Sequence, residues 1–426
     1  MIKEIFKRLE FYLILSLWAV ALLGNIVSHE TTPYTVNAKG LSFIIFSLII
    51  VLSIFYSTTW IPGQREDKSK STSLAIRLLF ILTLLGLLGS LILYIKSPYS
   101  SMELSLTRIQ FRESGLQIGP IKYILYFLIP CNIFAALLLI RLNFSPIVQL
   151  ITIIPILLSI YLNAKAVAGR ELLLATTVIS IACILITYRK HIATRAAFYG
   201  TLTATLGVLF ASANIFFIVT RIAGGRATES YYYRMTSDQG SDLLESIGFT
   251  DPGPQLAFST QVVFNYLFDP VRHFCFFTEK YDRFPSMGLY TLSTVSNRVP
   301  WFDHSEYRLH IDYINSDFGL ATNVWATAFR SIYVDFGYIG GLLFLAIVAL
   351  SYKRLLRLSN QSVGALLLAC LLLAAFLFSP YKDVVLFKSL EFYIYISICI
   401  LVYEKASGTN LWNRLERINS SRMLKR

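Results

Sequence analysis

Charged residues are scarce in this chain, and the common motifs of metal chemistry are missing. Asp, Glu, Lys and Arg make up 15% of its 426 residues, against about 25% in soluble domains. No C-x-x-C, H-E-x-x-H or Asp-x-Asp motif is present, so we predict no metal site and no cofactor. There is also no internal repeat, which many secondary transporters have.

The five cysteines indicate no disulfide framework. Only Cys275 lies in a region that we expect to be external, and it has no second external cysteine to pair with. The other four lie inside apolar segments, where a thiol behaves as a small hydrophobic group: Cys131, Cys183, Cys370 and Cys399.

Apolar residues are abundant and fall into long blocks. They make up 55% of the chain, and the mean hydropathy is +0.59. Several blocks reach the roughly 20 residues that cross a ~30 Å hydrocarbon core as a helix. We therefore predict an all-α polytopic membrane protein with about ten transmembrane helices, at 11–27, 41–60, 74–95, 121–141, 146–163, 172–188, 196–220, 333–352, 362–379 and 384–403.

Basic residues predict the orientation of these helices. Lys and Arg gather in the N-terminal tail, in alternate loops and in the C-terminal tail, which places both termini in the cytoplasm. This pattern also explains much of the net charge of +13 without a nucleic-acid partner. The predicted divisions are helices 1–7 in 1–220, a large periplasmic loop at 221–332, helices 8–10 in 333–403 and a basic cytoplasmic tail at 404–426.

The large loop contains one apolar stretch, 256–268, that is thirteen residues long and is followed by Asp269-Pro270. A spanning helix here would move the basic tail to the outside. We therefore expect a re-entrant or interfacial helix at 256–268.

Arginine dominates the basic residues that are predicted to be external. The large loop has eight arginines and one lysine, and Arg108, Arg112 and Arg170 lie in smaller external segments. A guanidinium binds phosphate through two parallel hydrogen bonds and keeps its charge when partly buried. The set indicates an anionic, phosphorylated ligand, although single arginines can also pair with nearby acids or with lipid phosphates.

A second group of ionisable residues alternates with apolar residues near 304–313. It comprises His304, Glu306, Arg308, His310 and Asp312. The period of two predicts an extended segment with all five groups on one face. Histidine and carboxylate are the usual general bases, and a solvated loop strand is the alternative interpretation.

Three local features resemble the O-antigen polymerase family. They are Gly169-Arg170 at an external helix turn, the large late external loop, and Asn323…Thr327…Asp335-Phe336-Gly337…Gly340 leading into the next helix. The resemblance implies a GT-C-like enzyme of the bacterial inner membrane with a periplasmic active site. It would polymerise oligosaccharide repeat units carried on undecaprenyl diphosphate, by inversion and without a metal.

The expected roles follow from these features. Diphosphate binding is assigned to Arg170, Arg272 and Arg298, with Arg112 and Arg330 as further candidates. Asp335 and His310 are alternative bases, with Asp312 as a third candidate or as the group that orients His310. Asn323, Trp325 and Tyr333 are the candidates for contact with acceptor sugars, although aromatic residues also anchor proteins at membrane interfaces.

Two alternative functions stay open. An O-antigen ligase-type glycan transferase would share the arginines and the topology, whereas a lipid-linked oligosaccharide flippase or transporter would place charges at mid-membrane. Membrane lipid and a polysaccharide chain-length regulator are the other expected partners.

Overall fold

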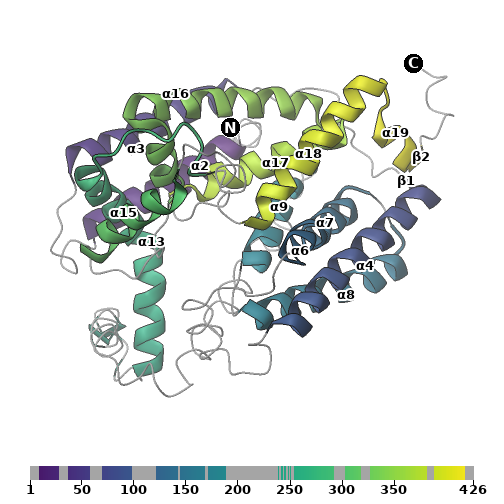
Figure 1. Cartoon of the computed structure of the whole chain (residues 1–426), viewed down its shortest axis with the longest axis horizontal. Coiled ribbons are helices and arrows are strands. Elements are labelled where there is room, and N and C mark those ends of the chain that lie inside the picture. The colour runs from purple at the N-terminus through teal and green to yellow at the C-terminus, as the bar shows by residue number, and fades with distance from the viewer. Residues whose placement is uncertain are drawn as a thin grey trace.

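The computed structural model describes residues 9–27, 37–57, 70–97, 121–142, 144–167, 171–188, 254–291, 303–317, 327–380 and 388–417, together with a few residues between 238 and 250. The described part is helical apart from two two-residue strands (Figure 1). Its elements are α2 (Leu9–Val27), α3 (Ala38–Tyr56), β1 (Lys70–Ser71), α4 (Ser73–Lys96), α6 (Ile121–Leu128), α7 (Cys131–Arg141), α8 (Pro146–Val167), α9 (Glu171–Thr187), α13 (Pro254–Lys280), α15 (His304–Asp317), α16 (Ala328–Leu358), α17 (Val363–Phe378), α18 (Lys388–Ser407), α19 (Leu411–Leu415) and β2 (Glu416–Arg417).

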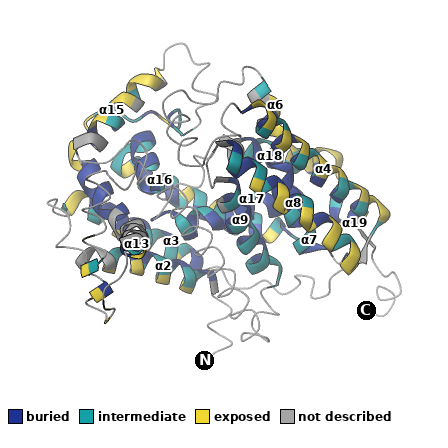
Figure 2. Ribbon diagram, turned by 90° about the horizontal axis from the view of Figure 1, so that it is seen from below, coloured by how far each residue is buried: buried dark blue, intermediate teal, exposed yellow. Residues whose placement is uncertain are grey.

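Four helices of the described part, α3, α4, α8 and α16, are long and apolar enough to cross a membrane, and four more are apolar but shorter. Exposed residues line the outer faces of α4 and α8 (Figure 2), among them Leu84 and Leu157. Large apolar side chains in such numbers on the outside are typical of a lipid-facing surface. The protein is therefore an α-helical membrane protein. The helix predicted at 196–220 lies outside the described residues.

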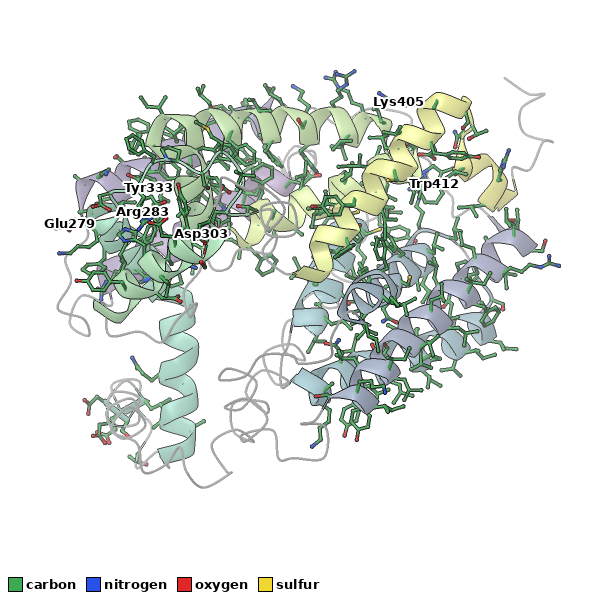
Figure 3. The ribbon with its side chains drawn as sticks, viewed as in Figure 1. Glu279, Arg283, Asp303, Tyr333, Lys405 and Trp412 are labelled. Carbon is green, nitrogen blue, oxygen red and sulfur yellow. The ribbon has the colours of Figure 1, made fainter. Side chains whose placement is uncertain are left out.

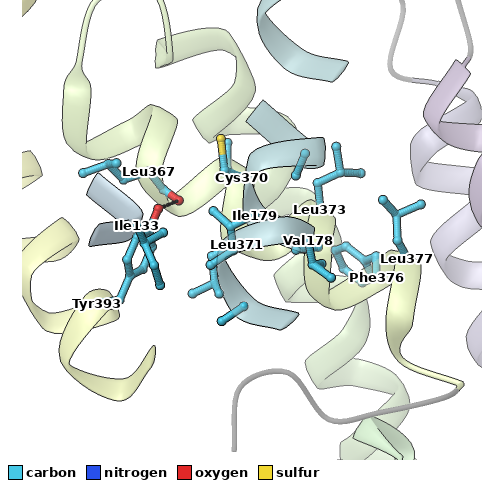
Figure 4. Close-up of a cluster of buried hydrophobic side chains, with 14 of the residues drawn as sticks. Ile133, Val178, Ile179, Leu367, Cys370, Leu371, Leu373, Phe376, Leu377 and Tyr393 are labelled. Atoms are coloured by element: carbon cyan, nitrogen blue, oxygen red, sulfur yellow. Dashed lines mark hydrogen bonds between the residues drawn. The ribbon is translucent and has the colours of Figure 1, made fainter. Parts of the chain in front are cut away.

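Helix α17 forms much of the core, because its apolar side chains meet neighbours on several sides (Figure 4). Leu371 and Leu373 are buried on the side of α17 that packs against α9, near Ile179. The Tyr393 hydroxyl of α18 donates to the Leu367 carbonyl at 3.0 Å. Within the hydrocarbon such a hydroxyl needs an internal partner.

Segments predicted to be cytoplasmic contact one another at one end of the molecule. The Lys353 ammonium donates to the Ser57 carbonyl at 3.2 Å, and the Trp412 indole donates to the Ser359 carbonyl at 3.2 Å. Strand β1 pairs with β2 in antiparallel fashion. The Glu404 carboxylate accepts hydrogen bonds from the first amides of α17. These contacts join chain segments that precede or follow several of the helices.

Segments predicted to be external likewise meet one another. The Ala328 amide donates to the Ser379 carbonyl at 3.1 Å, and the Ser97 hydroxyl donates to the Ala166 carbonyl at 2.6 Å. The segments predicted to be cytoplasmic thus contact one another, and so do those predicted to be external. This is the arrangement expected when successive helices cross the membrane in alternating directions.

Helix α13 differs from the expectation for 256–268. The helix continues through Pro270 to Lys280, so it is longer than the apolar stretch 256–268. A proline inside a helix costs about 3 kcal/mol, but the residues after it are buried against α2 and α3, with the Phe274 ring centroid 5.5 Å from that of Phe43. Tertiary packing outweighs the local preference. The N-terminal half stands away from the other helices (Figure 1).

The segment with alternating ionisable residues is a helix, α15, and not the predicted strand. Its buried residues, Ile311 and Ile314, follow Tyr307 at helical spacing. Asp303 caps the helix, since its carboxylate accepts from the Ser305 amide at 2.8 Å. The one-face arrangement of five ionisable groups is therefore incorrect.

Candidate functional site

Asp335 joins the loop after α13 to the start of α16. Its backbone carbonyl accepts from the Met287 amide at 2.7 Å. Its carboxylate accepts from the Ser286 hydroxyl at 2.5 Å, from the amides of Tyr290 and Thr291 at 3.0 and 3.2 Å, and from the Thr291 hydroxyl. We call this arrangement the Asp335 clamp. It fixes residues 286–291 against α16.

A break in α16 lies next to the clamp. Gly337 has φ 66° and ψ −163°, a backbone conformation that is strained for any residue with a Cβ atom. Asp335 is 1% exposed, and among the described residues its carboxylate accepts hydrogen bonds from the loop. These contacts indicate a structural role for Asp335 in holding the loop. Its predicted role as a base stays a prediction.

Aromatic residues connect the clamp to α15. The Tyr281 ring centroid lies 6.2 Å from that of Tyr333 and 5.6 Å from that of His310. The Lys39 ammonium of α3 lies 5.5 Å from the Tyr333 ring centroid. Burial raises the pKa of the Tyr281 hydroxyl, which has no hydrogen-bond partner in the described segments. Tyr281 thus connects Tyr333 to His310. Tyr333 itself is buried, at 6% exposed, and its contact with a sugar stays a prediction.

His310 lines an open cleft of about 550 Å³ between the loop and α15. Its Nε2 lies 3.2 Å from an Asp282 carboxylate oxygen. The Arg283 guanidinium lies 2.7 Å from the Glu306 carboxylate, and this hydrogen bond holds the pKa of Arg283 above its ordinary value. Such exposed pairs contribute only about 0–1 kcal/mol. Their main effect is to order the cleft walls. Figure 3 shows Arg283 and Tyr333 near one another, far from Lys405 and Trp412.

Asp282, and not Asp312, is the acid beside His310. On a helix, residues two positions apart point about 200° away from each other. Asp312 therefore cannot orient the imidazole along a shared face, and that prediction is wrong. An acid beside an imidazole nitrogen fixes the ring and its tautomer. Asp282 is near enough for this role, but its contact with Nε2 does not have hydrogen-bond geometry.

Arg330 is the most unusual side chain in the described part of the chain. It is 0% exposed, in the first turn of α16, and none of its three guanidinium nitrogens has a hydrogen-bond partner among the described residues. Its backbone amide donates to the Thr327 hydroxyl, which caps the helix. A helix N-terminus carries positive potential, so the local structure adds to the charge of the arginine without compensating it.

The structure describes only one of the other arginines that were predicted to bind diphosphate. Arg272 is buried in α13, at 2% exposed. Arg170, Arg112 and Arg298 lie outside the described residues, as do Asn323 and Trp325. The structure thus describes Arg272 and Arg330 from the predicted anion site, and Tyr333 from the acceptor site.

Several residues of the site carried no signal in the sequence. Asp282 and Phe284 follow the end of α13, far from His310 in the chain. No spacing rule connects the two segments, because α13 and α15 meet only through tertiary packing. Among the residues that line the cleft, Glu306 and His310 belonged to the alternating group and Arg283 to the external arginines.

The described residues contain no group of three or more His, Cys, Asp or Glu side chains placed to hold a metal ion. Comparisons with protein-family models, with curated proteins and with solved structures find no match.

Proposed function

We propose that this protein is a membrane glycosyltransferase that polymerises oligosaccharide repeat units carried on undecaprenyl diphosphate. The reaction takes place at the periplasmic face of the bacterial inner membrane. A hydroxyl of the acceptor unit forms a bond to the anomeric carbon of the donor chain with inversion. The bond from that carbon to the diphosphate breaks, and undecaprenyl diphosphate leaves.

The unpartnered guanidinium of Arg330 is the observation that carries this proposal. Leaving a buried charge without its partner costs roughly 3–5 kcal/mol. A protein keeps such a group when a ligand supplies the opposite charge. The leaving diphosphate is such an anion, and a positive group fixed in advance stabilises the charge that develops on it. Arg272, also buried, is the second candidate for this site.

The acceptor side of the reaction is assigned to His310. Imidazole is the usual side chain for such proton transfer, and Asp282, 3.2 Å from Nε2, is the carboxylate placed to stabilise an imidazolium. A general base of this kind contributes about 10²–10⁴-fold to the rate. Tyr281 and Tyr333 form an aromatic wall between this base and the start of α16.

The contacts at the two ends of the helices support the predicted topology. The basic segments meet at the end with Lys353 and Trp412. Positive charge next to the membrane remains on the cytoplasmic side. The opposite end, with Arg330 and His310, is then periplasmic, where lipid-linked repeat units arrive after flipping.

The test is polymer formation by the purified protein in nanodiscs, with lipid-linked repeat units as the sole substrate. A ligase makes no polymer from this substrate, and a flippase makes no new bond. We expect Arg330→Ala to lower the rate by about 10²–10³-fold, the usual effect of removing one charge-stabilising donor. Arg330→Lys should restore little, because an ammonium lacks the planar fork.

Arg354→Ala is the matched control, since Arg354 is exposed at the other end of the same helix. It should retain the full rate. Absence of polymer with wild-type protein, or full activity of Arg330→Ala, would reject the proposal.

A further inference from the structure

The cleft beside His310 has a composition that no role above explains. Besides His310, its walls are formed by Asp282, Arg283, Phe284, Glu306 and Tyr307. Its volume of about 550 Å³ lies within the roughly 300–1,000 Å³ that is usual for small-molecule sites. Five of the six residues can form hydrogen bonds through their side chains, and three have aromatic rings.

The cleft contains one ion pair and one further carboxylate. Arg283 faces Glu306 at 2.7 Å, and the Asp282 carboxylate lies 3.2 Å from His310. An anion entering the cleft would meet two carboxylates, and a cation would meet the Arg283 guanidinium beside the ion-paired Glu306. The electrostatics therefore disfavour an anion and provide no concentrated negative site for a cation, which leaves a neutral polar ligand as the best match.

The polar groups still have hydrogen-bonding capacity to offer. Glu306 uses one carboxylate oxygen in its ion pair, and the other has no partner among the described residues. The Asp282 side chain is 83% exposed. Carboxylates accept and a guanidinium donates hydrogen bonds, often in parallel pairs. Neighbouring hydroxyl groups of a sugar ring can bind both the carboxylates and the guanidinium, because each hydroxyl donates one hydrogen bond and accepts others.

One aromatic wall is held open towards solvent. Phe284 is 88% exposed, which is unusual for a phenyl ring outside the membrane-spanning helices. Its carbonyl accepts a hydrogen bond from the Tyr307 hydroxyl at 3.1 Å, and the Arg283 guanidinium lies 5.7 Å from the Tyr307 ring centroid. The two aromatic residues are thus fixed to each other across the cleft. The C–H face of a sugar ring packs against such a flat apolar surface.

We propose that this cleft binds a neutral sugar residue of the acceptor, with Phe284 as the stacking surface and Glu306 and Asp282 as hydrogen-bond acceptors. The binding of sugar follows from the cleft alone, whereas the identification of that sugar as the acceptor rests on the proposed function. Sugar bound here places a hydroxyl within reach of His310, which lines the same cleft.

The experiment measures sugar binding without catalysis. Wild-type protein in nanodiscs is mixed with a panel of methyl glycosides of neutral hexoses, deoxyhexoses and N-acetylhexosamines, and saturation-transfer NMR detects those that bind. At least one glycoside should receive saturation. Phe284→Ala and Glu306→Gln should each lower its signal at least fivefold.

Tyr313→Ala is the control, because Tyr313 is an exposed aromatic residue of α15, the helix of Glu306, and does not line the cleft. It should leave the signal unchanged. If no glycoside binds, or if the Phe284 and Glu306 variants bind as the wild type does, the cleft is not a sugar site. If sugar binds and no polymer forms from lipid-linked repeats, the cleft assignment stands and the proposed polymerase function fails.

Discussion

Replacement of Arg330 by methionine should make the protein more stable and less active. The guanidinium is fully buried, and within the part of the chain that the structure describes none of its nitrogens has a hydrogen-bond partner. A methionine of similar length fills the same space without the desolvation cost. Exchanging buried charges for apolar side chains has stabilised other proteins by roughly 1–4 kcal/mol, which corresponds to an increase of a few degrees in Tm.

The assay is thermal unfolding in nanodiscs with and without undecaprenyl diphosphate. Ligand should raise the Tm of the wild type, since binding to the native state stabilises it, and should leave that of Arg330→Met unchanged. Arg354→Met is the control for loss of positive charge at an exposed position of α16. A fall in Tm for Arg330→Met in the absence of ligand would show that the guanidinium has a protein partner, and would refute the reasoning.

Three further outcomes are expected. Asp335→Asn removes a charged acceptor of four hydrogen bonds and should cost about 2–4 kcal/mol of stability, while the folded fraction keeps its rate; a rate near zero in folded protein would make Asp335 the base. His310→Ala should lower polymer formation in nanodiscs by about 10²–10⁴-fold, and Asp282→Asn by about tenfold. Rates equal to that of the wild type in both variants would exclude His310 as the base and Asp282 as its partner. In a cysteine-free background, a cysteine at exposed Phe284 should react with an impermeant maleimide in intact cells and one at exposed Lys405 only after lysis; the reverse pattern would invert the topology.

The predicted helices were found where an apolar run alone determines the structure. For example, the spans predicted at 41–60 and 74–95 correspond to α3 and α4, because twenty apolar residues in lipid have few alternatives to a helix. The run at 121–141 is instead divided into α6 and α7 near Pro130, where the missing amide interrupts the hydrogen bonds.

The error at α15 came from counting the ionisable residues and not the apolar ones. Tyr307, Ile311 and Ile314 have the spacing of a helix face, and Asp303 followed three residues later by Glu306 is a helix-start pattern. Both signals were present in the sequence. The Asp282–His310 pair is different, because only the packing of α13 and α15 brings those side chains together.

The Glu404 contacts determine when the cytoplasmic end can assemble during synthesis. The first amides of α17 have no intrahelical acceptor, and they donate to a carboxylate some forty residues further along the chain. Until that residue leaves the ribosome and α18 inserts, water or the translocon must satisfy them. A chain that stops before Glu404 should therefore insert its earlier helices and still be removed by quality-control proteases that recognise the uncapped end.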